Sequence, residues 1–438
     1  MTDATAAGHA LPDANRIPAG QVLDATRGDY HTDGPSLFWL SMRQVFLAVI
    51  TLGIYRFWMT TNLRRHYWRA IRVLGDPFEY SGTGLEKLLG FLIAVIILAV
   101  YLGVFNLALT FGGLLSLDDP IELQVLTWLS FVASLPLIYF ATYRARRYIL
   151  ARTRWRGIRF GMEQAAWKYT WRALLLTLLS MVTLGLLYPY QHFKLEKFKT
   201  DRTWFGDLSF EQGGSWVQLF KYWVWFYVIA AIIAAAIAGA VASPENASAR
   251  TLAIVAGIFG YIAIFIVGIR YQVAAFRYLW GNRTLGGARF SNDIDTGEVI
   301  GVYIGGSIAT SICAALVGAV ILSVLGGLAY FLIGQDTLTA LLSNLPAEDG
   351  ADGDTTSVYS AGYWAGILGA VVGYITIGAA AFAFAQIFIT RPILRRKAEG
   401  MQIYNVSALA ESRQRGHDDA RDAGGFADAL GVDVGAGF

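Results

Sequence analysis

Long stretches without Asp, Glu, Lys or Arg constrain this chain more than any other feature. They cover residues 88–117, 123–143, 173–193, 222–244, 251–269, 299–335 and 355–390. A helix needs about 20 apolar residues to cross the hydrocarbon core of a bilayer, and most of these stretches reach that length. Charged residues make up only 15% of the 438, against about 25% in an ordinary soluble domain. The sequence therefore predicts an all-α polytopic membrane protein.

The charges between these stretches predict their orientation. Residues 144–172 hold nine basic side chains and one acidic one, Glu163. The other connections with at least four Lys or Arg are 64–87, 194–221, 270–298 and 391–397. Short loops rich in Lys and Arg stay on the cytoplasmic side. We therefore expect three transmembrane hairpins, with both chain termini in the cytoplasm. These hairpins are 88–143, 222–269 and 299–390.

Two segments that contain the tripeptide Thr-Leu-Gly, here called the TLG segments, need another explanation. Segment 173–193 has basic connections at both ends, so a single crossing would invert the hairpin that follows. We expect it to be re-entrant or interfacial, broken at Gly185 and Pro189 of "TLGLLYPY", with 37–59 and its "TLGIYRFW" behaving alike. The alternative is two ordinary helices, giving eight crossings. The candidate re-entrant or gating residues are Thr51, Leu52, Gly53, Tyr55, Thr183, Leu184, Gly185 and Pro189.

An internal repeat of about 130 residues accompanies these segments. Gly53 and Gly185 differ by 132 positions, as do Phe78 and Phe210. Five residues of "RYILARTRWRGIRF" recur 130 positions later in "RYLWGNRTLGGARF". We expect a polar tail at 1–36, repeat units at 37–168 and 169–300, a third transmembrane hairpin at 301–397, and a disordered polar tail at 398–438.

The basic connections of the two repeats, here called the arms, combine Arg with aromatic residues beside a membrane end. There, cations can meet anionic phosphates and rings can lie at headgroup depth. Gly157 and Gly287 permit a tight turn between short extended pieces, so that Arg159 and Phe160 would face opposite ways. Anchoring by positive charge alone would give the same composition. The candidate lipid-interface residues are Gly75, Phe78, Arg147, Tyr148, Gly157, Arg159, Phe160, Gly206, Phe210, Arg277, Tyr278, Gly287, Arg289 and Phe290.

Composition argues against most chemistry. The net charge is only +3, which does not suit a nucleic-acid partner. Cys313 is the single cysteine, and the five histidines have no metal-ligand spacing. No acid lies in the long apolar runs, which disfavours an ion-coupled carrier. We expect no catalytic residue, metal or cofactor. Glycines four residues apart, such as Gly301 and Gly305, permit close helix packing within one chain or in a homo-oligomer.

Four strings together resemble the YjgN family of bacterial inner-membrane proteins, also called domain of unknown function 898. They are "TLGIYRFW" with the following "LRR", "FEYSGTG", "RTRWRGIRFG" and "TLGLLYPY". The resemblance covers residues 37–300 well and the third hairpin loosely. Arg56-Phe57 stands where the family's first TLG segment has a small residue and proline, which argues against both segments breaking alike. The resemblance implies a bacterial inner-membrane location and no catalytic residues, since the family has no assigned activity.

Three functions remain open from the sequence. The first is a non-enzymatic, multi-pass inner-membrane protein whose arms form a cytoplasmic, lipid-facing collar with a scaffold or envelope-related role. Its partners would be membrane lipids, chiefly anionic ones. The second is a channel or facilitator for a small solute, with the TLG segments lining a path. The third is an intramembrane lipid-modifying enzyme, which ranks last because no catalytic constellation is visible.

Overall fold

The computed structural model describes residues 25–32, 37–111, 120–333, 361–410 and 412–415. The chain forms two compact units. Unit 1 comprises Met1–Asp33, Arg64–Ile300 and Arg395–Phe438, and unit 2 comprises Gly34–Leu63 and Gly301–Leu394. The five-part division expected from the sequence stays a prediction.

The expectation of an all-α protein is wrong, because unit 1 contains an eleven-stranded antiparallel sheet. The strand order is β1-β11-β10-β9-β8-β7-β6-β5-β4-β3-β2. The strands are β1 Ala25–Arg27, β2 Asp29–Tyr30, β3 Ile71–Val73, β4 Asp76–Tyr80, β5 Thr153–Trp155, β6 Ile158–Met162, β7 Thr203–Phe205, β8 Leu208–Gln212, β9 Arg283–Leu285, β10 Ala288–Asn292 and β11 Met401–Tyr404. The arms are therefore β-hairpins.

Each hairpin joins a three-residue strand to a five-residue strand through a two-residue turn. In the β5–β6 turn, Arg156 has φ 52° and Gly157 has φ 76°. Left-handed residues in such turns match the twist of the flanking strands. Thr153 and Trp155 are buried while Arg154 between them is half-buried. Apolar and polar side chains therefore alternate across the sheet, as pleating requires.

Pairing between hairpins explains why sequence periodicity misses the sheet. Phe78 of β4 lies opposite Trp155 of β5, and Phe160 of β6 lies opposite Phe205 of β7. Each such partner belongs to a different hairpin. An isolated two-stranded hairpin is marginal in water, and three to five residues carry little periodic signal. These strands are stable only because hairpins distant in sequence join one another.

The sheet nearly closes into a barrel at Gly28. Strand β1 pairs with β11 and β2 pairs with β3, and Gly28 alone separates β1 from β2. The Gly28 amide donates to the Met401 carbonyl oxygen at 2.9 Å. A Cβ at residue 28 would overlap the Ala398 carbonyl oxygen. Glycine at residue 28 therefore lets the chain connect β1 and β2, the two edge strands of the sheet, so that the sheet keeps almost no free edge.

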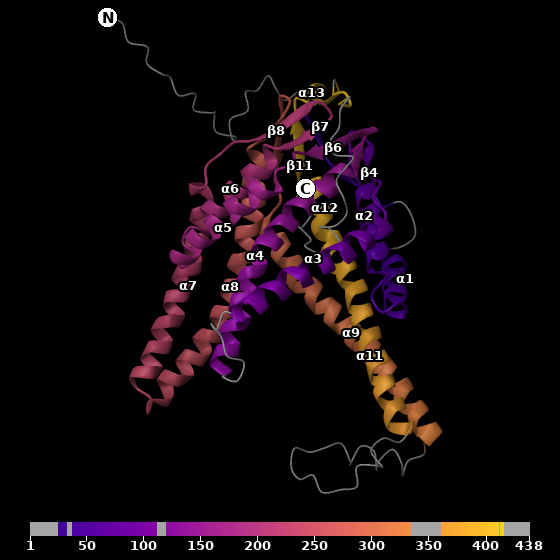
Figure 1. Cartoon of the computed structure of the whole chain (residues 1–438), viewed down its shortest axis with the longest axis vertical. Helices are drawn as coiled ribbons and strands as arrows, with labels where there is room; N and C mark the ends of the chain where they lie inside the picture. Colours follow the sequence, from indigo (N-terminus) through magenta and orange to yellow (C-terminus); the bar gives the residue numbers. More distant parts are fainter. Residues whose placement is uncertain (1–24, 33–36, 112–119, 334–360, 411, 416–438) are drawn as a thin grey trace, which may run out of the picture. The chain divides into compact units, whose positions relative to one another are not determined.

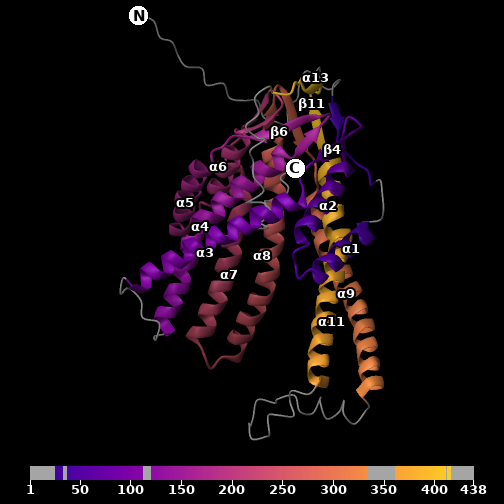
Figure 2. The ribbon, with the colours of Figure 1, turned by 45° about the vertical axis from the view of Figure 1, so that its right-hand side comes forward.

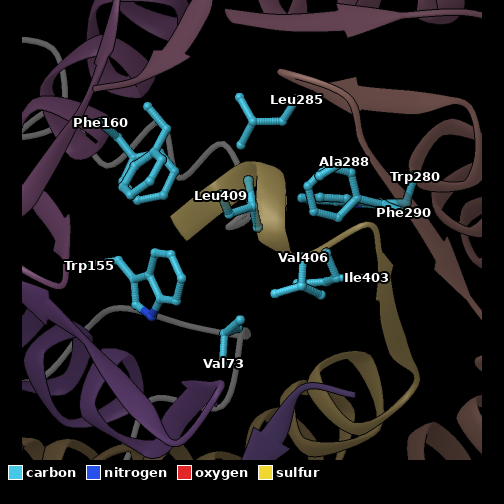
Figure 3. Close-up of a cluster of buried hydrophobic side chains, with 11 residues drawn as sticks. Val73, Trp155, Phe160, Trp280, Leu285, Ala288, Phe290, Ile403, Val406 and Leu409 are labelled. Carbon is cyan, nitrogen blue, oxygen red and sulfur yellow. The ribbon is translucent and has the colours of Figure 1, made fainter. Parts of the chain in front are cut away.

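The barrel interior is a hydrophobic core plugged by the chain after β11. Val406 precedes the short helix α13, Ser407–Ala410, which carries Leu409. Figure 3 shows Leu409 between Trp155 and Phe160 on one side and Ala288 and Phe290 on the other. Parts of the expected tails thus supply β1, β2, β11 and α13. The buried core residues are Val73, Trp155, Phe160, Phe205, Trp280, Leu285, Ala288, Phe290, Ile403, Val406 and Leu409.

The helices of unit 1 extend from this barrel (Figure 1). They are α3 Gly84–Phe111, α4 Pro120–Ala151, α5 Ala166–Val182, α6 Tyr188–Thr200, α7 Val217–Ala242 and α8 Ala247–Gly281. Helices α7 and α8 lie side by side in both views (Figure 2). Helix α4 packs against α3 and α5, and α6 packs against α5 and α7.

Unit 2 is helical in the part of the chain that the structure describes. Helix α1 is Leu37–Ile50, α11 is Ala361–Ala385, and a π-helix, η2, follows at Gln386–Thr390. Phe38 of α1 packs against Phe384 of α11 with ring centroids 5.4 Å apart. Helices α2 Arg56–Ala70, α9 Thr296–Ile333 and α12 Arg391–Glu399 each contain residues of both units.

Five of the described helices are long and apolar enough to cross a membrane, which makes this a multi-pass membrane protein. They are Gly84–Phe111, Val217–Ala242, Ala247–Gly281, Thr296–Val324 and Val371–Glu399. All five overlap the three hairpins expected from the sequence and extend beyond their bounds. Helix α4, the expected return helix of the first hairpin, is not among them.

The internal repeat appears as a repeated order of elements. The order α1, α2, β3, β4, α3, α4, β5, β6 recurs as α5, α6, β7, β8, α7, α8, β9, β10. Strand β3 begins at Ile71 and its equivalent β7 at Thr203, while β5 begins at Thr153 and its equivalent β9 at Arg283. The offsets found in the sequence are therefore the offsets between equivalent strands.

Candidate functional site

Both TLG segments break in the same way. Leu52 has φ 49° and Gly53 φ 88°, while Leu184 has φ 52° and Gly185 φ 85°. Each of these glycine amides donates at 2.6 Å to the carbonyl oxygen five residues earlier. This is the pattern of a helix end with left-handed residues. The substitution of Arg56-Phe57 for the family's usual pair does not prevent it, because the Leu-Gly conformation sets the break.

The threonine of each TLG segment hydrogen-bonds to the backbone around the break, and a new helix begins after the glycine. The Thr51 hydroxyl donates to the Leu47 carbonyl at 2.8 Å and accepts from the Tyr55 amide at 2.9 Å. The Thr183 hydroxyl donates to the Leu179 carbonyl at 3.0 Å. Pro189 lies in the first turn of α6, where its missing amide hydrogen costs nothing. The short flanking helix Leu37–Ile50 is apolar but not long enough to be a candidate span.

Helix α7 satisfies the backbone carbonyls that the second break frees. Trp223 donates its indole hydrogen to the Gly185 carbonyl oxygen at 3.0 Å, and Tyr227 donates to the Leu184 carbonyl oxygen at 2.8 Å. An unpaired carbonyl inside hydrocarbon would cost several kcal/mol. The break is therefore compatible with a location inside a bilayer.

The two TLG segments expose the same apolar positions. Leu52 is 93% exposed and its repeat equivalent Leu184 is 87% exposed. Trp39 and Trp171, which are 68% and 64% exposed, are related by the same repeat offset. The remaining exposed equivalents are Phe46 with Leu178, Ile50 with Val182, and Ile54 with Leu186. This surface, which occurs once in each segment and which we call the TLG face, is the kind of unpartnered apolar surface that lipid covers.

Helix α5 adds cations at the barrel end of its apolar face. Trp167 and Trp171 are exposed, as are Lys168 and Arg172 beside them. The exposed side chains that follow are apolar: Leu175, Leu178, Leu179, Met181 and Val182. Trp with Lys or Arg at one end of an apolar helix face is typical of a membrane–water interface. The α5 sequence therefore suits a helix that enters lipid from its first turn.

The predicted arm residues lie in the strands and turns of the barrel and in the ends of helices α4 and α8 that precede them. Phe160 and Phe290 are buried in the barrel core, and Phe78 and Phe210 pack against it. Phe160 and Phe290 therefore contribute to the core, whereas Phe78 and Phe210 are half-buried, and the expected lipid contact of the arm residues stays a prediction. The glycines Gly75, Gly157, Gly206 and Gly287 all have positive φ in hairpin turns.

The other arm residues divide into structural and exposed groups. Arg147 is buried and donates to the Met162 carbonyl at 3.1 Å, and Tyr148 donates to Glu86 at 2.9 Å. Tyr278 accepts from the Ser215 amide at 2.7 Å. The exposed members are Arg277 and Arg289. The Arg159 amide donates to the Gln414 side chain at 2.8 Å, so the chain after α13 crosses β6.

A buried charge cluster lies beneath the barrel. Glu196 of α6 forms ion pairs with Lys199, with Arg146 at 3.0 Å and with Arg283 at 3.6 Å. Burial raises the pKa of Glu196, but the three cations lower it more, so it stays well below its ordinary value. Burial lowers the pKa of Arg283 to about 10, which leaves it charged at neutral pH. Burial likewise lowers the pKa of Lys199, partly countered by Glu196.

A groove of about 820 Å³ opens next to this cluster, between α6, the hairpin strands β8 and β9, and the end of α8. Arg283 belongs to the charge cluster and also lines the groove. Its Nε donates to Oε1 of Gln212, another lining residue, at 2.9 Å. The lining residues are Lys197, Asp201, Ser209, Phe210, Glu211, Gln212, Gly213, Gly214, Gly281, Asn282, Arg283, Thr284 and Arg289. In the described part of the chain, no three of His, Cys, Asp and Glu come together to hold a metal ion.

Sequence reasoning missed the cluster and most of the groove. Glu196 stands alone among lysines in "KLEKFK", and Gly213-Gly214 follows "FEQ" directly. Such isolation does not by itself identify a buried ion pair, since Glu163, alone among the basic side chains of 144–172, is 55% exposed. Gly214 lines the groove with φ 89°, a left-handed conformation that glycine adopts without strain.

Comparison with known proteins gives the family. The profile of a family described as bacterial proteins of unknown function, DUF898, matches residues 25–429. The chain belongs to the DUF898 family. The match begins at β1 and includes β11 and α13, so the DUF898 region contains every strand of the barrel.

Two curated relatives of this DUF898 protein are named inner membrane protein YjgN, from Escherichia coli O157:H7 and from Escherichia coli strain K12. Each is 26% identical over 159 residues, which is 36% of this chain and 36% of the relative. The chain therefore spans about a third of the length of the curated relatives it matches. No solved structure matches this DUF898 chain.

Proposed function

We propose that this DUF898 protein is a non-enzymatic, lipid-interacting protein of the bacterial inner membrane, with a scaffold or envelope-related role. The TLG face and the first two turns of α5 make the lipid contacts, and anionic phospholipids are the preferred partners. The observation that carries the proposal is the exposure of equivalent apolar side chains in both repeats, exemplified by Leu52 and Leu184.

The apolar part of this surface favours lipid strongly. Trp171, Leu175, Leu178, Val182 and Leu184 are each at least 60% exposed on one side of the second TLG segment. Removing one large apolar side chain from water is worth about 1.5–3 kcal/mol. Five such residues on one helix and its turn would make an aqueous location for α5 very unfavourable.

The charged part favours anionic headgroups. Lys168 and Arg172 lie one residue after Trp167 and Trp171, on the exposed side of α5. A Lys or Arg near an anionic membrane surface contributes about 1 kcal/mol. The two cations together would favour an anionic lipid over a zwitterionic one by roughly tenfold or more, since about 1.4 kcal/mol is a factor of ten.

Native mass spectrometry tests this preference. The protein would be reconstituted with equal amounts of phosphatidylglycerol and phosphatidylcholine, extracted in mild detergent, and the retained lipids identified. We expect phosphatidylglycerol to predominate, and the double variant Lys168→Gln, Arg172→Gln to lose that preference. The matched control is Arg27→Gln, Arg156→Gln, which removes two exposed cations from the barrel and should keep it.

Two results would contradict the proposal. One is a wild-type protein that retains both lipids equally or retains neither. The other is a Lys168→Gln, Arg172→Gln variant that behaves like its barrel control.

A further inference from the structure

The groove beside β8 and β9 contains positively charged side chains that take no part in the lipid contacts proposed above. Lys197 and Asp201 line it and form an ion pair at 3.1 Å. Lys197 also donates to the backbone carbonyl oxygen of Gln212 at 2.5 Å, and Asp201 accepts from the backbone amide of Gln212 at 2.8 Å. This pair is internally balanced and holds the end of α6 against β8.

The buried cluster next to the groove is not balanced. Among the residues that the structure describes, Glu196 is the single carboxylate that pairs with Arg146, Lys199 and Arg283. The Arg283 side chain is 6% exposed and lines the groove. Uncompensated buried charge costs several kcal/mol. An anion in the groove would offset part of that cost.

Arg289 supplies a second guanidinium to the same groove. It lies opposite Thr284 across β9–β10, and Thr284 lies opposite Glu211 across β8–β9. Glu211, Thr284 and Arg289 therefore form one outward-facing row that lines the groove. Within the described residues, the Arg289 side chain has no hydrogen bond or ion pair, and it is exposed.

We propose that this groove binds a phosphate group, carried by a phosphate ester or a phospholipid headgroup, with Arg289 as its direct cationic ligand and the buried Arg283 adding positive charge from the opposite face of β9. Guanidinium groups suit this ligand because their planar N–H fork matches two phosphate oxygens. The Thr284 hydroxyl, between Glu211 and Arg289 in the row, offers a neutral donor. The site shares no residue with the TLG face, so either proposal can fail alone.

Glu211 allows a prediction that a uniformly basic surface would not allow. Its carboxylate lines the same groove and repels an anion. Removing that charge should tighten phosphate binding, whereas a zwitterionic or cationic ligand would bind less well without it.

Isothermal titration of the full chain in a neutral detergent provides the first measurement, with inorganic phosphate and pyrophosphate as probes at low salt. We expect saturable binding of at least one probe. Arg289→Gln should weaken it about tenfold, because the variant loses a charge-assisted guanidinium–phosphate hydrogen bond. Glu211→Gln should tighten it about threefold.

The internal repeat provides the matched control. Arg159 occupies the position on β6 that Arg289 occupies on β10, and it does not line the groove. Arg159→Gln removes the same charge from the same barrel and should leave binding unchanged. All three variants alter half-buried or exposed strand positions, so folding is expected to survive.

A second arm distinguishes the source of the phosphate. Nanodiscs containing phosphatidylglycerol replace detergent, and displacement of pyrophosphate by the lipid is measured. Competition that depends on Arg289 identifies a headgroup, and its absence identifies a soluble phosphate ester. The proposal is overturned if neither probe nor lipid binds saturably, if Arg289→Gln binds like Arg159→Gln, or if Glu211→Gln weakens binding.

Discussion

Arg283 on β9 donates its Nε hydrogen to Gln212 on β8 at 2.9 Å, and both side chains are buried. The side-chain amide of Gln212 in turn donates to the Leu279 carbonyl oxygen at 2.9 Å, which joins the barrel to the end of α8. Arg283 also reaches Glu196 on α6. This connection makes the charge cluster a junction between strands of the barrel and the helices below it.

Glu196→Gln should destabilise this junction by about 3–5 kcal/mol, because the buried Lys199 and Arg283 and the half-buried Arg146 would lose their shared carboxylate. The measurement is chemical denaturation in detergent, followed by tryptophan fluorescence. Glu163→Gln is the control. Glu163 pairs with Arg202 at 3.2 Å but is 55% exposed, so its loss should cost less than about 1 kcal/mol. Equal losses for the two variants would contradict the structural role of the cluster.

Acid should remove the same contribution from the wild-type protein. The folded-state pKa of Glu196 is well below its ordinary value. Its contribution to the free energy of unfolding is therefore complete above the unfolded-state pKa of about 4.3 and is lost as pH falls toward the lower folded-state value. Unfolding measured between about pH 6 and pH 3 should show this loss in the wild type and a smaller one in Glu196→Gln. Parallel curves for the two proteins would count against it.

Gly28→Ala should open the barrel, because the added Cβ would overlap the Ala398 carbonyl oxygen. Overpacking of this kind costs about 1–3 kcal/mol. Hydrogen exchange should then accelerate in β1, β2 and β11. Gly103→Ala in helix α3 is the control, since nothing lies within 4 Å of a Cβ there. Unchanged exchange in the Gly28→Ala variant would show that closure tolerates a side chain.

Leu409→Ala should loosen the barrel interior. Leu409 is 5% exposed and belongs to the core cluster, and truncating a buried leucine costs about 2–5 kcal/mol. Thermal unfolding measures the change, and Ser407→Ala, on the exposed side of α13, should shift it little. If the two variants unfold at the same temperature, the C-terminal helix does not contribute to the core.

A spin label at residue 184 should lie in hydrocarbon. With Cys313 replaced by alanine, Leu184→Cys would carry the label at the most exposed point of the second TLG segment. We expect collisions with oxygen to exceed those with a water-soluble nickel chelate, because oxygen concentrates in lipid. Glu211→Cys, on the barrel surface, should show the reverse order. Nickel accessibility at residue 184 equal to that at residue 211 would contradict the lipid contact.

Local features of the sequence predict a good part of this protein. Long uncharged runs predict membrane helices because a helix satisfies its own backbone hydrogen bonds. The breaks at Gly53 and Gly185 follow from residues that adopt positive φ, again a local property. The two repeat offsets also survive into the structure, since the equivalent strands β3 and β7, and β5 and β9, keep them.

The barrel, the charge cluster and the groove depend on tertiary structure. Strand β6 pairs with β7 of the next hairpin, and β11 pairs with β1 from the other end of the chain. The rings of Phe160 and Phe290 turn inward because closure creates an interior for them, whereas in an unpaired arm they would face the membrane surface. Strands this short are stabilised only by distant partners, and no periodicity within three to five residues can identify those partners.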